Sequence, residues 1–118
     1  LSKREADIAI TIDRPEAGRI AVRRLTDYTL HLYGAKSYLD RHGRPTSTED
    51  LRVHQLVTYV QDLIFSPDLN FMPEIFGPGY RRLECASAVG QDAAVRAGAG
   101  LGILHDYHAG HDRALERV

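Results

Sequence analysis

A chain of 118 residues is long enough for one domain with a modest hydrophobic core. Hydrophobic residues make up 43% and charged residues 26%, as in ordinary soluble proteins, and no apolar run approaches the roughly 18 residues of a membrane span. The formal net charge of −1 lacks the basic excess of a free-standing DNA-binding domain. Cys85 is the only cysteine, which excludes an intramolecular disulfide. Because no signal-peptide pattern is visible either, we expect a cytoplasmic protein.

The first half of the chain alternates apolar segments with turns. Residues 7–12, DIAITI, are apolar and β-branched after the first position, which is typical of a strand buried on both faces. Residues 36–43, KSYLDRHG, predict a short helix that ends at Gly43. Further predicted elements are strands over 19–25, 28–35 and 55–60, and a helical turn over 47–54 that Ser47 or Thr48 caps.

The second half begins with an unusual segment. Residues 61–80 have weak periodicity, three prolines and three phenylalanines, which indicates a long loop of a kind that is often functional. Beyond it we expect strands over 81–87 and 101–104, a helix over 88–98, and then a short helix and the start of another strand. Strands that alternate with helices predict an α/β fold with a largely parallel sheet.

The glycine-rich stretch GAGLG, residues 98–102, resembles a dinucleotide-binding loop in its spacing. Such a loop, however, follows a strand and opens a helix, whereas here the predicted helix comes first and the strand second. Gly98 is better explained as a helix end and Gly100 as part of a tight turn into the strand. We therefore predict no nucleotide cofactor.

The stretch GILHDYHAGHD, residues 102–112, combines imidazoles with carboxylates, which are common metal ligands. Its histidines are His105, His108 and His111. In a helix the first and last of these would lie about 120° apart around the axis, so one ion could not easily collect all three rings. Gly110 also interrupts any longer helix. We predict no metal site, with a two-ligand pair of His105 and His108 as the alternative, and His105, at a strand end, becomes a candidate pocket residue first.

Three motifs in order resemble one known family, the LysR-type transcriptional regulators, in their effector-binding domain. The motifs are READIAI, RRLTDYTLHLYGAKSYLDRHGRPTSTEDLRVHQLVTYV and AVRAGAGLGIL. The resemblance implies an α/β, Rossmann-like domain of two lobes, similar to periplasmic binding proteins, with a small-molecule inducer in the cleft between the lobes. It also implies that residues 26–82 form the second lobe, and that residues 1–25 and 83–118 belong to the first lobe and the crossovers.

The sequence departs from the family pattern in three ways. No winged helix-turn-helix precedes the motifs, so we expect no nucleic-acid binding by this chain, although a full-length parent would bind DNA. The opening strand and helix of the first lobe are missing, so we expect an incomplete first lobe. An exposed sheet edge left by that gap favours a homo-oligomer. Finally, His105 stands where the family commonly has proline.

Ligands of open α/β sheets sit beyond the carboxyl ends of the strands. That placement, the loop composition and the resemblance together give the candidate ligand-binding residues Thr11, Asp13, Arg14, Tyr59, Gln61, Phe65, Phe71 and Ser87. Arg14 could pair with both oxygens of a carboxylate inducer, and its alternative is an ordinary solvated arginine. Ser87 could instead cap the helix that follows it.

We interpret the chain as the inducer-sensing module of a LysR-type regulator, non-enzymatic, with no catalytic residue and no cofactor. An inducer that binds one lobe arrangement better would shift the population of states, and the parent protein would relay the shift to its DNA-binding domains. The alternatives are a solute-binding protein of the same two-lobe architecture and a small metal-dependent enzyme that uses residues 105–112.

Overall fold

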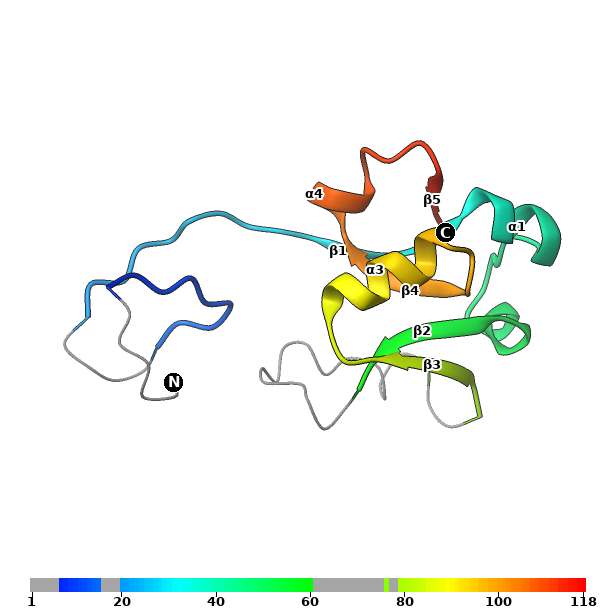
Figure 1. Cartoon of the computed structure of the whole chain (residues 1–118), viewed down its shortest axis with the longest axis horizontal. Coiled ribbons are helices and arrows are strands. Elements are labelled where there is room, and N and C mark those ends of the chain that lie inside the picture. Colours follow the sequence, from blue (N-terminus) through cyan, green and yellow to red (C-terminus); the bar gives the residue numbers. More distant parts are fainter. Residues whose placement is uncertain (1–6, 16–19, 61–75, 77–78) are drawn as a thin grey trace.

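The computed structural model describes residues 7–15, 20–60, 76 and 79–118. Within them, a five-stranded sheet has the strand order β3-β2-β4-β1-β5 (Figure 1). The strands are β1 (Leu30–Ala35), β2 (Gln55–Tyr59), β3 (Arg81–Cys85), β4 (Leu101–His105) and β5 (Leu115–Arg117). The helices are α1 (Lys36–His42), a 3-10 helix η1 (Glu49–Val53), α3 (Ala88–Arg96) and α4 (Asp106–Ala109). None of these helices is long and apolar enough to cross a membrane.

The sheet is mixed in direction. Strand β2 pairs in parallel with β3 and β4, whereas β1 pairs antiparallel with β4 and β5. The α/β class is confirmed, but the expectation of a largely parallel sheet is wrong, because β1 runs against both of its neighbours. Residues on both sides of position 82 share this sheet, since Leu30 of β1 pairs with His105 of β4, and the expected division into lobes stays a prediction.

Helices cover both faces of the sheet, and small residues let them approach. Tyr33 pairs with Gly102, and neighbouring residues of a strand point to opposite faces, so Gly34 and Gly102 face opposite sides. Leu39 of α1 lies over Gly34, and Val95 of α3 lies over Gly102. The largest fully buried side chains are Leu39, Leu56, Val57, Val95 and Leu101. The core therefore lies on both faces of β1, β2 and β4.

Several local predictions are confirmed. Helix α1 ends at Gly43, whose φ of 87° favours glycine. Gly98, with φ of 78°, follows the end of α3, and a Cβ on Gly100 would lie 2.3 Å from the Gln55 carbonyl oxygen. The predicted helical turn is η1, where the Ser47 hydroxyl accepts a hydrogen bond from the Asp50 amide at 3.3 Å.

The N-terminal segment, residues 7–15 and 20–28, stands off the sheet as irregular chain (Figure 1). Ile8 and Ile10 are 85% and 81% exposed. The predicted strand over 7–12 is therefore wrong for this structure, and residues 20–25 of the predicted strand over 19–25 form no strand either. A β-branched pattern favours extended chain, but a strand also needs a neighbour for its backbone hydrogen bonds, and this segment pairs with none of the described strands.

Candidate functional site

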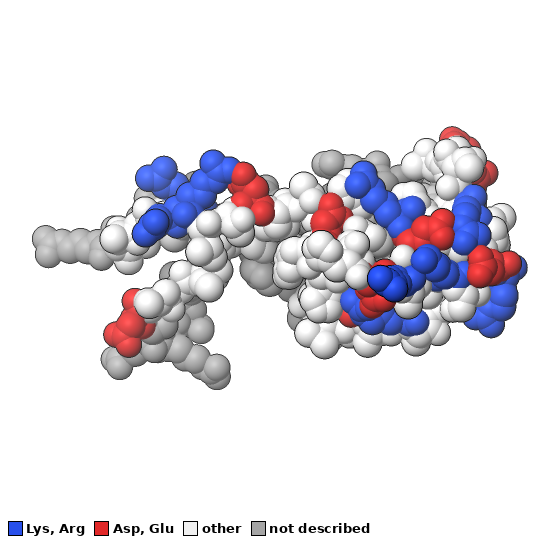
Figure 2. All heavy atoms as spheres, turned by 90° about the horizontal axis from the view of Figure 1, so that it is seen from above, with Lys and Arg blue, Asp and Glu red and all other residues white. Residues whose placement is uncertain are grey.

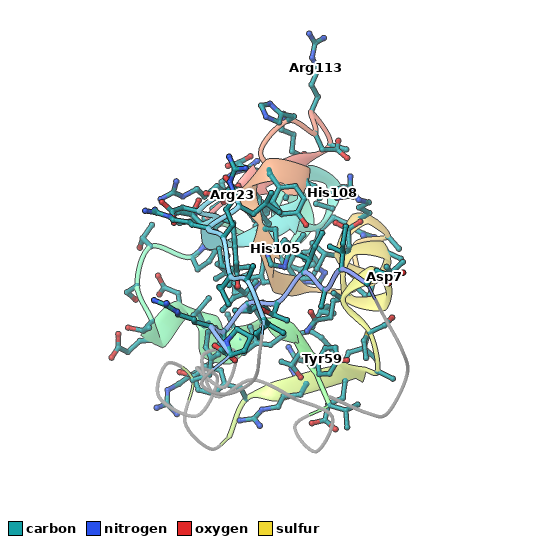
Figure 3. The ribbon with its side chains drawn as sticks, turned by 90° about the vertical axis from the view of Figure 1, so that its left-hand side faces the viewer. Asp7, Arg23, Tyr59, His105, His108 and Arg113 are labelled. Carbon is teal, nitrogen blue, oxygen red and sulfur yellow. The ribbon has the colours of Figure 1, made fainter. Side chains whose placement is uncertain are left out.

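The parallel strands β2, β3 and β4 end on the same side of the sheet, which we call the carboxyl edge. Their last residues are Tyr59, Cys85 and His105. Figure 3 looks at this side of the molecule, with His105 near the centre and Tyr59 below it, whereas Arg113 points away from the body. Ligands of α/β sheets bind beyond such strand ends. The carboxyl edge is therefore where a site is expected.

His105 lies between two tyrosine rings at this edge. Its ring centroid is 5.0 Å from that of Tyr28, in an edge-to-face arrangement, and 5.4 Å from that of Tyr107. Its Nδ1 atom is buried and has no hydrogen-bond partner. Burial, together with the nearby His108, lowers the pKa of His105. The imidazole is therefore neutral at pH 7 and keeps an unused hydrogen-bonding atom.

Thr58, one residue before the end of β2, is the second such group. It is 3% exposed, and its hydroxyl has no hydrogen-bond partner. Because Val57 pairs in parallel with Gly102, Thr58 is level with Ile103 and faces the same side of the sheet as His105. Buried polar atoms in folded proteins are nearly always hydrogen-bonded. Two unpaired ones on one face of neighbouring strands mark this place as unusual.

The opposite face of the edge carries a network around Asp106, the first residue of α4. Alternate residues of β1 and the residue before it, Thr29, His31 and Tyr33, share that face. The Thr29 and Tyr33 hydroxyls donate to the Asp106 carboxylate, the latter at 2.8 Å, and His31 Nδ1 lies 2.7 Å from it. The Thr29 bond first, then His31, lowers the Asp106 pKa to about 2. This network fixes α4 to β1.

An ion-pair cluster joins α3 to the segment after α4. Arg96 donates to Asp92 and also pairs with Asp112. His108 Nδ1 lies 3.1 Å from the Arg96 guanidinium and 3.5 Å from the Asp92 carboxylate. Among the described residues, no three His, Cys, Asp or Glu side chains group closely enough to hold a metal ion. On the compact part of the molecule, at the right of Figure 2, acidic and basic side chains are interspersed rather than separated by sign.

The predicted site residues fall into three groups. Tyr59, half-buried, and Ser87, which caps α3 by accepting from the Gly90 amide at 3.0 Å, both lie at the carboxyl edge. Three others, Thr11, Asp13 and Arg14, lie on the N-terminal segment and are exposed. The Thr11 hydroxyl donates to the Asp13 carbonyl at 2.8 Å. Gln61, Phe65 and Phe71 lie outside the described residues. Of the five candidates that the structure describes, it thus brings two together at the edge.

Sequence reasoning missed two features of this edge. The alternating polar residues Thr29, His31 and Tyr33 were a visible signal for a polar stripe on one face, but nothing in the sequence linked them to Asp106. Thr58 carried no signal, because a threonine inside QLVTYV is ordinary for a strand.

Comparison with known proteins identifies the family. The family model for the LysR substrate binding domain matches residues 1–118. The chain belongs to the LysR substrate-binding domain family. No curated protein sequence matches the chain.

Solved structures of LysR-type regulators share the fold of this LysR domain. The regulatory domain of CrgA from Neisseria meningitidis has 24% identity and a TM-score of 0.61, over 81% of this chain and 49% of that one. The AphB regulatory domain from Vibrio vulnificus has 20% identity and a TM-score of 0.57, over 77% and 49%. Full-length CbnR in complex with its target DNA has 19% identity and a TM-score of 0.53, over 77% and 33%. The chain thus spans about half the length of the regulatory domains it matches.

Proposed function

We propose that this LysR domain senses a small-molecule effector for a transcription regulator and binds that molecule at the carboxyl edge. The match of the LysR substrate binding domain over residues 1–118 carries the proposal. The position of His105 and Tyr59 at the ends of parallel strands supports the location. CbnR was solved with its target DNA, and by that likeness we infer that a full-length parent of this chain binds DNA. A cytoplasmic location and the absence of catalysis by this domain are further parts of the proposal, and they rest on the family match.

The sheet suggests how the chain takes part in a two-lobe domain. Residues 30–118 contribute all five strands of one sheet, and the N-terminal segment leaves it at the carboxyl edge (Figure 1). We infer that this sheet is one lobe and that the N-terminal segment leads to the other, so the effector sits between them. An effector that binds one arrangement of the lobes more tightly shifts the population toward it, by as much as its affinities differ.

The N-terminal segment bears on the charge of the effector and on self-association. Arg14 is exposed on the N-terminal segment, so its guanidinium is available to a carboxylate. The exposed apolar residues Ile8 and Ile10 on the same segment favour self-association, because such surfaces are seldom left in water. A carboxylate effector and a homo-oligomer are therefore parts of the proposal.

Thermal denaturation of the purified chain with a library of small acids, phenols and amides tests this function. A bound effector at one hundred times its Kd stabilises the folded state by about 2.7 kcal/mol. The matched variants are His105→Gln, at the edge, and His111→Gln, which is exposed and follows the end of α4. We expect at least one compound to raise the Tm of the wild type and of His111→Gln but not of His105→Gln. Stabilisation that is equal in all three proteins contradicts the site.

A carboxylate effector is tested separately with Arg14→Ala. If the guanidinium binds the effector, the affinity of an acid falls in this variant whereas that of its amide does not change. Equal affinities of the acid for the wild type and Arg14→Ala discard the role of Arg14.

A further inference from the structure

The aromatic side chains at the carboxyl edge form a partly exposed group. Tyr28 is 38% and Tyr107 is 67% exposed, and both contact the His105 ring between them. Exposed aromatic rings in mutual contact present faces and edges that another ring can pack against. We call Tyr28, His105 and Tyr107 the ring cluster.

The polar atoms beside this cluster are uncharged and unsatisfied. His105 Nδ1 and the Thr58 hydroxyl are both buried without a partner, on the same face of β4 and β2. Residues placed diagonally on neighbouring strands are roughly 7–8 Å apart, which is within the span of one small molecule. A neutral imidazole and a hydroxyl can each donate or accept a hydrogen bond, but neither supplies a positive charge.

We propose that the ring cluster binds the aromatic part of the effector, and that His105 Nδ1 and Thr58 bind an uncharged polar group on it, such as a phenol hydroxyl or an amide. This inference rests on the proposed function and names the chemical class that the site prefers. A carboxylate is disfavoured at this point, because an anion that leaves water loses its hydration and needs a cation in its place. Any carboxylate on the same molecule must instead face the N-terminal segment and Arg14.

Three probes of similar size separate the contributions: phenol, benzoate and cyclohexanol. Phenol has the ring and an uncharged hydroxyl, benzoate has the ring and an anion, and cyclohexanol has the hydroxyl without aromaticity. Their affinities are measured by NMR titration in the Arg14→Ala background, so that a carboxylate contact there does not contribute. We expect phenol to bind about 2- to 12-fold more tightly than cyclohexanol, the range of one aromatic pair, and more tightly than benzoate.

Variants of the exposed Tyr107 then test the ring cluster without threatening the core. Tyr107→Leu is expected to remove the preference for phenol over cyclohexanol, whereas Tyr107→Phe keeps it. Thr58→Val is expected to weaken the binding of phenol. The binding of benzene, which has the ring without the hydroxyl, should not change. Benzoate that binds as tightly as phenol, or a preference that survives Tyr107→Leu, overturns this inference but leaves the proposed function intact. If no compound of the library and none of the three probes binds, both the proposed function and this inference are overturned.

Discussion

The unpaired hydroxyl of Thr58 makes a sharp prediction about stability. Thr58 is 3% exposed, and its Oγ1 atom has no hydrogen-bond partner. Leaving a buried hydroxyl unpaired costs about 1–3 kcal/mol, and valine fills nearly the same volume with a methyl group in its place. Thr58→Val should therefore raise the free energy of unfolding by about 1–2 kcal/mol. This is the lower part of the cost of an unpaired hydroxyl, because the surroundings relax.

The assay is urea denaturation, with thermal melting as a second readout. For a chain of 118 residues, each kcal/mol of stability corresponds to a shift of roughly 3–6 °C in Tm. Thr26→Val is the matched control, because Thr26 is exposed and the change should stay within about 0.5 kcal/mol.

The result that refutes the reasoning is a Thr58→Val protein that is less stable than the wild type with an unchanged urea m-value. That outcome would mean that the hydroxyl has a partner in solution, such as a buried water. If the prediction holds and Thr58→Val also binds phenol more weakly, the hydroxyl costs stability in the free protein and is used on binding. Such a trade-off is typical of binding sites.

Three further predictions concern acid, charge and packing. Burial, and then the nearby His42, lowers the pKa of His54, so the folded state favours its neutral form. The stability of the fold should therefore be complete above the unfolded-state pKa of about 6.5 and should fall as the pH drops below that value. Urea midpoints between pH 7.5 and 5 measure this loss, and a flat profile contradicts it. Asp106→Asn should lower the Tm at pH 7, because three side chains lose a charged acceptor. The difference should shrink as the pH falls toward 2, because about half of the wild-type carboxyl is protonated at its pKa of about 2. A difference that persists at pH 2 would assign the effect to shape rather than charge. Gly100→Ala should cost about 1–3 kcal/mol, since its Cβ would lie 2.3 Å from the Gln55 carbonyl oxygen. Gly90→Ala inside α3 should cost less, because its Cβ would meet the Ser87 hydroxyl at 3.2 Å, a side chain that can shift, and alanine favours a helix over glycine. Equal unfolding midpoints for the two variants would refute the packing argument.

Local sequence patterns predicted much of the sheet. The helix α1 with its glycine end, the caps near η1 and α3, and the strands β2, β3 and β4 all follow from short-range periodicity and turn residues. These features depend on neighbours in the sequence, so the sequence contains the information that determines them.

The failures have a common physical cause. Residues 7–12 have the composition of a buried strand, but composition does not supply the neighbouring strand that would pair with it. The antiparallel placement of β1 depends on partners near residues 102–117, which no local pattern identifies. The contacts of Asp106 with Thr29, His31 and Tyr33 span more than 70 residues, and for that reason the carboxyl edge could be located only coarsely.

The placement of β1 also bears on how the chain folds during synthesis. Both neighbours of β1 in the sheet come from residues 101–117, and His31 meets Asp106 at a separation of 75 residues. A ribosome that releases the chain from its N-terminus therefore exposes β1 and α1 long before their partners exist. Contacts of such long range slow folding and leave strand edges uncovered in the meantime. Strands β4 and β5 follow the other described strands in the sequence, and they are the ones that close the sheet around β1.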